Sequence, residues 1–258
     1  MSYEFVKIDK QAIGTIILNR PQRKNALNAR LMKDIVDALW EMDRDEKVKV
    51  IVIKGQGNVF CAGADMEELI AGDSIMEKRA HKENVSNMIE AIGRVSKLVI
   101  AQVDGYALAG GCGLAIACDM VIASETATFG LPEIHRALFP MTIMAPISRA
   151  IGWKKGMEWY FVGDNISGKQ AAELGLVNYA VPSEELEAKT RELAGKIADK
   201  SIAALRLGKE AFYTMRDMEY FTALRYLKDM ILITTLTEDA KEGVKAFFEK
   251  RQPKWIDR

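Results

Sequence analysis

The sequence contains few of the residues from which disulfide and metal sites are built. Its 258 residues include three cysteines, Cys61, Cys112 and Cys118, and two histidines. An odd number of cysteines without a Cys-x-x-Cys spacing excludes a disulfide framework and a redox dithiol, and two histidines leave little for a zinc site. We therefore expect no metal, and we expect a reducing, cytoplasmic setting for these thiols.

Net charge, long apolar runs and flexible linkers are missing as well. The 36 basic residues are balanced by 36 acidic ones, whereas proteins that bind nucleic acid or acidic membranes carry a basic excess. No apolar segment follows a basic start, and no apolar run approaches membrane-spanning length. The sequence thus predicts neither a nucleic-acid partner nor a membrane partner, and no Pro/Gly/Ser-rich stretch divides it.

What is present is typical of a folded protein with a large core. Hydrophobic residues make up 49% of the chain, which excludes a disordered protein. Hydrophobic periodicity predicts an α/β region followed by helices alone. Strands are predicted at 4–9, 12–19, 49–54, 98–103, 120–123, 128–129 and 177–181, and helices at 29–42, 66–69, 74–95, 114–118, 140–151, 153–162, 167–174, 186–200, 203–215, 218–235 and 237–251.

A glycine-rich stretch lies between a predicted buried strand and a helix of small apolar residues. Gly110 and Gly111 have no Cβ to obstruct a close approach of the backbone, and N–H groups at the start of a helix attract a negative or polarised oxygen. A second small-residue turn, residues 58–65, follows another apolar strand. Two backbone donors from two such turns would suit chemistry in which a thioester becomes an enolate.

These two turns resemble motifs of the crotonase, or enoyl-CoA hydratase/isomerase, superfamily. The stretch from Arg20 to Asn28 is similar to the first signature of that family, and residues 246–251 are similar to its last. Four motifs in the right order make the probability of a chance resemblance very small. The resemblance implies a spiral of ββα units over residues 1–195 and an all-helical region over 196–258 that mediates formation of a trimer, often stacked as a dimer of trimers.

The resemblance also implies roles for residues in the two turns and after them. It makes the backbone N–H groups of Ala64 and Gly110 the oxyanion donors and Glu133, in Phe-Gly-Leu-Pro-Glu, the catalytic acid/base. Taken alone, a glutamate after proline is most often solvated. If Phe139, Met141 and Met144 surround Glu133, burial would raise its pKa, as a general acid near neutral pH requires.

The sequence departs from the family pattern at Gly113, where typical hydratases carry a second glutamate that helps to hold and activate water. A further departure is the segment 140–146, with Met and Ile where typical hydratases have a glycine-rich Pro-Gly-Ala-Gly-Gly. His135 is a possible replacement acid, because in an extended segment it would point to the same face as Glu133. The favoured interpretation places His135 at a solvated or subunit-contact edge.

Other residues near the motifs have a structural and a chemical interpretation. Asp65 and Glu67 are expected as helix caps, or else as residues that reach the site. Cys112 stands at a helix start, which lowers the pKa of a thiol, but the resemblance assigns it no nucleophilic role and a small packed residue is favoured. The Gly-Gln-Gly at 55–57 is no dinucleotide motif, because Phe60 stands where the third glycine would be.

The substrate implied by the resemblance is an acyl-CoA thioester, with coenzyme A as part of the substrate and no separate cofactor. Arg23 and Lys24 are the expected partners of its phosphates, and the backbone of Ala26 and Ala62 would lie near the adenine. Phe247 and Lys250 match positions that, in the family, reach CoA on a neighbouring subunit. Further substrate contacts are expected from Asp65, Met66, Gly111, Gly113, Pro132 and Met141.

Three functions remain open at this point. Reversible hydration of a 2-enoyl-CoA, the commonest reaction of the family, is placed first by a narrow margin. Isomerisation between 3-enoyl-CoA and 2-enoyl-CoA is the alternative, because one carboxylate, Glu133, suffices for it. A non-catalytic CoA-binding protein of the same fold is the third, and the retention of Glu133 and both oxyanion turns argues against it. RNA binding, known for one branch, is disfavoured because no basic helix stands out.

Overall fold

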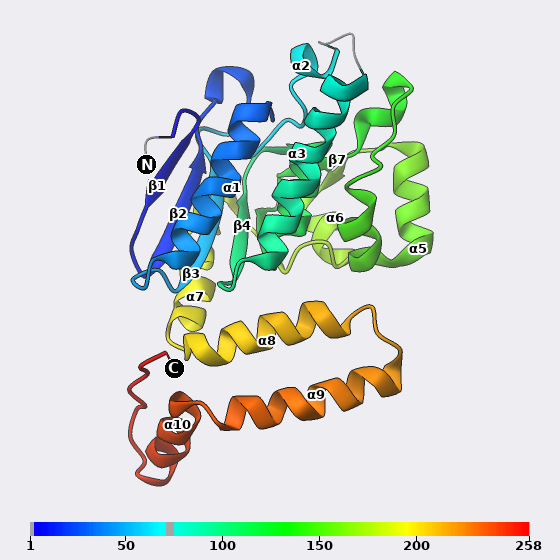
Figure 1. Cartoon of the computed structure of the whole chain (residues 1–258). Coiled ribbons are helices and arrows are strands. Elements are labelled where there is room, and N and C mark those ends of the chain that lie inside the picture. Colours follow the sequence, from blue (N-terminus) through cyan, green and yellow to red (C-terminus); the bar gives the residue numbers. More distant parts are fainter. Residues whose placement is uncertain (1–2, 71–74, 258) are drawn as a thin grey trace.

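We describe the chain from a computed structural model, which covers residues 3–70 and 75–257. The core is a six-stranded sheet in the order β1-β2-β3-β4-β6-β9, beside a three-stranded sheet in the order β5-β7-β8 (Figure 1). The strands of the large sheet are β1 Val6–Asp9, β2 Ile13–Leu18, β3 Val50–Gly55, β4 Val99–Val103, β6 Met120–Ser124 and β9 Tyr179–Val181. Those of the small sheet are β5 Tyr106–Leu108, β7 Thr128–Gly130 and β8 Ile166–Ser167.

The large sheet is parallel except at one edge. β1 and β2 form the predicted antiparallel hairpin, and β2, β3, β4, β6 and β9 then pair in parallel. Parallel strands bring their carboxyl ends to one edge of the sheet, which is where the chain leaves β3 for residues 58–65 and leaves β4 for the glycine-rich stretch. This topology places the two predicted turns side by side.

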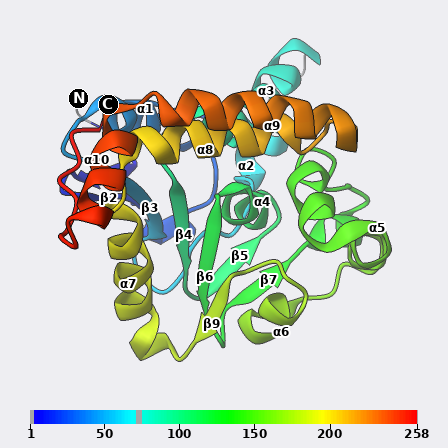
Figure 2. The ribbon, with the colours of Figure 1, turned by 90° about the horizontal axis from the view of Figure 1, so that it is seen from below.

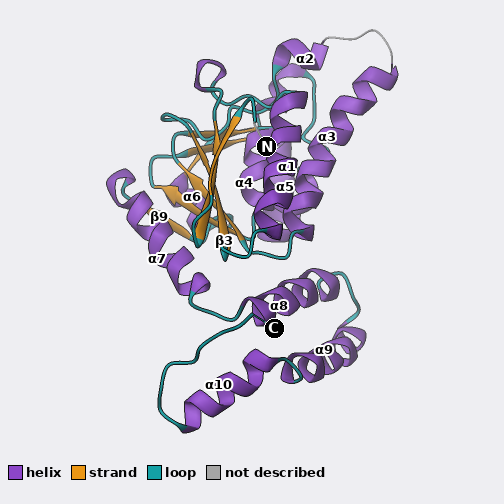
Figure 3. Cartoon of the chain, turned by 60° about the vertical axis from the view of Figure 1, so that its left-hand side comes forward, coloured by secondary structure: helices purple, strands orange, loops and turns teal. Residues whose placement is uncertain are grey.

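Helices cover both faces of the large sheet (Figure 3). On one face lie α1 Ala29–Arg44 and α3 Ile75–Arg94, with α4 Gly110–Ala117 and α5 Met144–Val162 beyond them. The predicted apolar face of α1 is buried as expected, and Asn28 caps this helix by accepting the N–H of Leu31. α7 Leu186–Ala198 covers the other face, against apolar residues of β3, β4 and β6.

The last third of the chain is helical, as the sequence predicts. After α7 come α8 Ile202–Met215, α9 Tyr220–Thr235 and α10 Glu238–Phe248. α8 and α9 run side by side below the core in two perpendicular views (Figures 1 and 2). α9 and α10 carry large exposed apolar side chains, including Phe221, Leu232, Phe247 and Phe248.

A buried ion pair fixes α8 to the core. Lys209 donates to Asp119 at 2.7 Å and to the carbonyl oxygens of Ile92 and Lys97, each at 2.9 Å. Tyr213, one helical turn further on, donates to the second carboxylate oxygen of Asp119 at 2.9 Å. Because each polar atom of this cluster has a partner, the helical region is held in a defined position.

Several predicted elements differ in their limits. The helix predicted at 114–118 starts at Gly110, so Gly110 and Gly111 lie inside α4 and the preceding turn is made by Ala109. The start predicted for the helix 74–95 falls on Ser74, outside the described residues, and α3 is described from Ile75. β5 and β8 were not predicted, because strands this short carry too little alternation. The remaining helices are α2 Met66–Ile70 and α6 Gly168–Glu173, with short 3-10 helices at Pro21–Arg23, Pro132–Arg136 and Ser183–Glu185.

The two helices predicted at 140–151 and 153–162 form α5, which is broken where the prediction separates them. Gly152 has φ 75° and ψ 171°, a conformation that interrupts a helix and that glycine adopts without strain. Residues 140–143 precede the helix, since Pro140 lies in a turn whose carbonyl accepts the N–H of Met144. In the described part of the chain, none of the helices combines the length and hydrophobicity of a membrane-spanning segment.

Candidate active site

The two predicted oxyanion donors lie next to each other. A Cβ placed on Gly110 would stand 4.0 Å from the backbone nitrogen of Ala64. Leu27 pairs with this turn by donating to Gly63 and accepting from Asp65, so the N–H of Ala64 points to the opposite side, where α4 begins. As the first residue of α4, Gly110 has no acceptor for its N–H within the helix. The geometry thus brings two backbone donors to one place.

The backbone around these donors is strained and closely packed. Ala109, immediately before α4, has φ 50° and ψ −126°, a conformation that costs a residue with a Cβ free energy. Its N–H donates to Gly130 at 2.8 Å, and its carbonyl accepts the N–H of Gly113 at 3.0 Å. A Cβ on Gly111 would lie 2.4 Å from the carbonyl oxygen of Cys61, so only glycine allows this helix to approach the first turn.

Glu133 lies in the 3-10 helix Pro132–Arg136, directly after β7. Its Oε2 atom is shielded from solvent, and its charge is close enough to Cys112 in α4 to affect that thiol. Met141, which is expected to help enclose this carboxyl, is 66% exposed in the single chain. Phe139 packs instead on Phe161, with ring centroids 5.0 Å apart, beside the segment that carries Glu133.

Ile143 lies against Gly113. A Cβ on Gly113 would be 2.1 Å from Cγ2 of Ile143 and 2.7 Å from its Cβ, distances that atoms not bonded to each other do not reach. Ile143 is 3% exposed and Gly113 is buried. The two departures from the family pattern are therefore coupled: the isoleucine fills the space that any side chain at position 113 would need. The sequence shows both residues but not their contact.

Tyr160 connects the two halves of α5 across the break at Gly152. Its hydroxyl lies 2.8 Å from Oγ of Ser148 and donates to the carbonyl of Met144 at 3.3 Å, both in the first half of the helix. The side chain is 3% exposed, and its ring lies 6.4 Å from that of Phe139. This bracing fixes the start of α5, and with it Ile143, relative to the second half of the helix.

The other acid–base candidates from the sequence have partners outside the oxyanion turns. Asp65 forms an ion pair with Arg20 at 3.0 Å and accepts the N–H of Glu67, the capping role that was favoured. Glu67 pairs with Arg23. His135 is not in an extended segment, so it does not share a face with Glu133; its Nε2 lies 3.3 Å from the carbonyl oxygen of Gly163. The role of Arg20 was missed, because no local pattern shows a pair 45 residues apart.

The three cysteines are buried and unpaired. Burial raises the pKa of the Cys61 thiol to about 12. Burial, with a further contribution from the charge of Glu133, also raises the pKa of Cys112 above its usual range. The lowering expected from the helix N-terminus is therefore overridden, and Cys112 is the packed residue that the sequence favours.

The residues expected to bind CoA fall into two groups. Arg23, Lys24, Ala26 and Ala62 lie together, since Ala62 donates to the carbonyl of Lys24 at 3.0 Å and Ala26 donates to that of Arg23 at 3.0 Å. Arg23 is held by Glu67 through both of its terminal nitrogens. Phe247 and Lys250 lie at the end of α10, outside the core that carries Glu133 (Figure 1), and Phe247 is 78% exposed.

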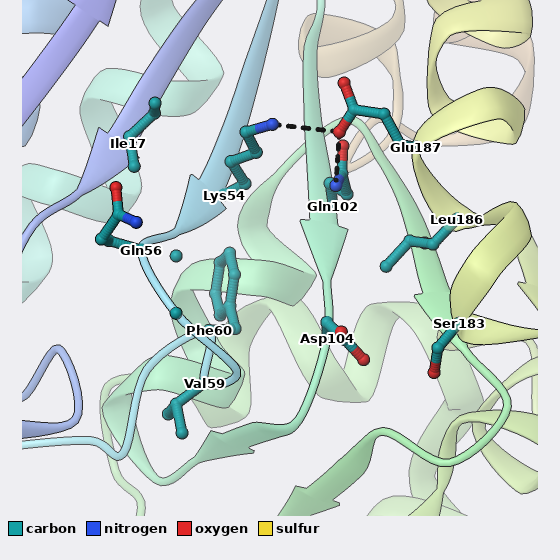
Figure 4. Close-up of a pocket in the computed structure, with 12 residues that line it drawn as sticks. Ile17, Lys54, Gln56, Val59, Phe60, Gln102, Asp104, Ser183, Leu186 and Glu187 are labelled. Atoms are coloured by element: carbon teal, nitrogen blue, oxygen red, sulfur yellow. Dashed lines mark hydrogen bonds and ion pairs between the residues drawn. The ribbon is translucent and has the colours of Figure 1, made fainter. Parts of the chain in front are cut away.

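A polar cavity of about 380 Å³ lies on the α7 side of the large sheet. Figure 4 shows Glu187 accepting hydrogen bonds from Lys54 and Gln102, each at 3.0 Å. Gly55, Gln56 and Gly57 line this cavity, whereas none of the residues predicted for the acyl-CoA site does. The cavity therefore borders the turn at residues 58–65 through Val59 and Phe60, but it does not contain the predicted oxyanion donors.

Comparison with known proteins agrees with this geometry. The sequence model of the family described as enoyl-CoA hydratase/isomerase matches residues 9–258. The chain belongs to the enoyl-CoA hydratase/isomerase family. Relatives include a probable enoyl-CoA hydratase of Mycobacterium tuberculosis, 36% identical over 260 residues and covering 100% of both chains. A probable mitochondrial enoyl-CoA hydratase of Dictyostelium discoideum is 36% identical over 247 residues, covering 95% of this chain and 88% of the relative.

Solved structures of the family have the same fold. An enoyl-CoA hydratase subunit from Geobacillus kaustophilus superimposes with a TM-score of 0.93 at 35% identity, covering 100% of both chains. Human enoyl coenzyme A hydratase domain-containing protein 3 superimposes with a TM-score of 0.94 at 30% identity, covering 98% of this chain and 100% of the human one. The predicted crotonase-like fold, with its all-helical C-terminal region, is confirmed.

Proposed function

We propose that this family member moves the double bond of an enoyl-CoA thioester between the 3-enoyl and 2-enoyl positions, with Glu133 as its acid/base. The observation that carries the proposal concerns the candidate acid–base residues. Among these candidates, Glu133 has a carboxylate oxygen shielded from solvent, and it lies close enough to α4 for its charge to affect Cys112. Isomerisation needs one such group, and hydration needs in addition a held and activated water.

The proposed reaction moves one proton and leaves the composition of the substrate unchanged. The Glu133 carboxylate removes a proton from C2 of the 3-enoyl thioester, and the electrons of that C–H bond form the enolate. The negative charge on the thioester oxygen is stabilised by the N–H groups of Ala64 and Gly110. Protonated Glu133 then returns the proton to C4, which leaves the double bond between C2 and C3.

Binding of the CoA portion follows the same proposal. Lys24 and Arg23 would contact its phosphates, in which case a phosphate competes with Glu67 for Arg23. The backbone of Ala26 and Ala62 would lie at the adenine. Because Phe247 and Lys250 lie away from their own core, they would serve the site of a neighbouring subunit in a trimer or a dimer of trimers.

Hydration, which the sequence places first, is the second candidate. The observation in its favour is the name of several relatives at 36% to 37% identity, each a probable enoyl-CoA hydratase. In that reaction Glu133 would transfer the protons of a water held by other groups.

The two candidates are separated by incubating the purified protein with a 3-enoyl-CoA and, separately, with a 2-enoyl-CoA. Isomerisation gives a conjugated thioester, seen by its ultraviolet absorbance, without a change of mass. Hydration adds the mass of one water to the 2-enoyl-CoA. We expect the first result, and we expect Glu133→Gln to reduce its rate by about 10² to 10⁴. Water addition by the wild type without isomerisation would contradict the proposal, and inactivity on every enoyl-CoA would support a non-catalytic protein.

A further inference from the structure

The contact between Ile143 and Gly113 lies next to the proposed reaction centre. Gly113 follows Gly110 by one helical turn, and residues with this spacing are neighbours on the same face of a helix. The side chain that covers Gly113 therefore lies beside the donor that would hold the thioester oxygen. Ile143 is that side chain, with its Cγ2 only 2.1 Å from where a Cβ at 113 would stand.

The position of Ile143 is fixed by its surroundings. It immediately precedes α5, and its carbonyl accepts the N–H of Ile147 at 3.3 Å. The next residue, Met144, donates to Pro140 and accepts from the hydroxyl of Tyr160. With its side chain buried and its backbone held on both sides, Ile143 keeps an apolar group packed on Gly113.

An apolar surface at this place affects one of the two possible reactions. In hydration the oxygen of water bonds to C3 while one of its O–H bonds breaks, and a proton bonds to C2 with the π electrons of C2=C3, so that the elements of one water are added. Such a water must be held by two or more polar partners in order to be positioned. The branched hydrocarbon side chain of Ile143 offers no hydrogen bond, so it removes space and partners from a water without affecting proton transfer by Glu133.

We propose that Ile143 determines the reaction specificity of this site: by filling the space beside Gly113 it keeps water from the double bond, so that a 2-enoyl-CoA is released without being hydrated. This proposal rests on the isomerisation proposed above. The proposal concerns the access of water to the bound substrate, and the quantity that tests it is the ratio of hydrated to isomerised product.

The test uses a pair of variants that differ by one hydroxyl. Ile143→Val and Ile143→Thr have nearly the same branched shape, but threonine places a hydroxyl where valine has a methyl group. Each protein is supplied with a 3-enoyl-CoA, and the isomerised and hydrated products are quantified by mass. We expect Ile143→Thr to raise the ratio of hydrated to isomerised product about fivefold to tenfold over Ile143→Val, the effect of one added hydrogen bond to water.

Ile147→Ala and Ile143→Ala complete the experiment. Ile147 is fully buried in α5, one turn after Ile143, so its truncation tests the effect of a cavity close to that residue. Ile143→Ala is expected to raise the product ratio, and Ile147→Ala is expected to leave it at the wild-type value. If the wild type isomerises and all four variants give the same product ratio, the role of Ile143 is overturned while the proposed function stands. A wild type that only hydrates would overturn the proposed function as well.

Discussion

A Cβ on Gly63 would stand 2.8 Å from the Cβ of Ala109 and 2.8 Å from the carbonyl oxygen of Leu108. Gly63 has φ 96°, in the region that favours glycine, and it directly precedes Ala64. The two turns that carry the proposed oxyanion donors therefore touch through residues that leave no room for an added atom. The spacing of the donors depends on the absence of a side chain at position 63.

Gly63→Ala is expected to separate the two turns and to move the N–H of Ala64 away from Gly110. Loss of one oxyanion donor reduces kcat by about 10² to 10³, so a reduction of that order is expected with an enoyl-CoA substrate. The matched control is Gly57→Ala, at φ 85°, where the nearest atom to an added Cβ is 3.9 Å away. Both variants strain the backbone, but only the first displaces a donor; equal activities would contradict this account.

Gly113→Ala is expected to lower the free energy of unfolding by about 1–3 kcal/mol, since the added methyl group overlaps Ile143. Truncation of Ile143 should make room for this methyl group. The two changes, Gly113→Ala and Ile143→Ala, form a double-mutant cycle, measured by urea unfolding. We expect the loss of unfolding free energy in the double variant to be smaller than the sum of the two single losses by about 0.5–3 kcal/mol. Additive effects would show that the two residues do not compete for the same space.

Lys209→Met is expected to loosen α8 from the core, because it leaves Asp119 buried without its cation. Breaking a buried ion pair in this way costs about 3–5 kcal/mol of stability. Arg149→Met is the control, since Arg149 and Asp217 form an exposed pair between α5 and the end of α8, for which a cost below about 1 kcal/mol is expected. Urea unfolding of both variants compares the two costs.

The ion pair of Glu187 predicts a loss of stability in acid. Partial burial by itself would raise the pKa of Glu187, but hydrogen bonds from Lys54, Gln102 and Arg191 outweigh it and lower the pKa to about 2. The carboxylate therefore contributes its full stability above its ordinary pKa of 4.5, and the contribution is lost as the pH falls from 4.5 to about 2.

The corresponding variant is Glu187→Gln, measured by urea unfolding at pH 6 and at pH 3. We expect it to be less stable than the wild type by about 1 kcal/mol at pH 6, a value that allows for screening by solvent, and we expect the difference to shrink at pH 3. Glu185→Gln, an exposed neighbour, serves as the control. A difference that grows toward acid pH would contradict the assigned direction.

Periodicity and glycine patterns were sufficient for most of the fold. The apolar face of α1, the hairpin β1-β2 and the four C-terminal helices follow from local signals that packing then reinforces. The break of α5 at Gly152 was also predictable from local sequence, because the conformation of a single glycine produces it. Two-residue and three-residue strands such as β8 and β5 were beyond such signals, since partners elsewhere in the chain define them.

The parts of the candidate site that are made by the backbone were predictable from sequence motifs. The proximity of Ala64 and Gly110 follows from two turns at the same edge of a parallel sheet. Contacts between side chains distant in sequence were not predictable: Ile143 against Gly113, Arg20 with Asp65, and the exposure of Met141 depend on how α5 and the first turn pack in three dimensions. The sequence alone therefore showed which residues were unusual and not why they occur together.

The burial of all three cysteines has a practical consequence. Since the thiolate is the reactive form, thiols shielded from water and with raised pKa values remain unreacted toward alkylating reagents while the chain is folded. Cys61, Cys112 and Cys118 are distributed over the first turn and the two ends of α4, which together carry the proposed oxyanion donors. The rate at which these thiols take up a label thus reports how often the proposed site opens to solvent.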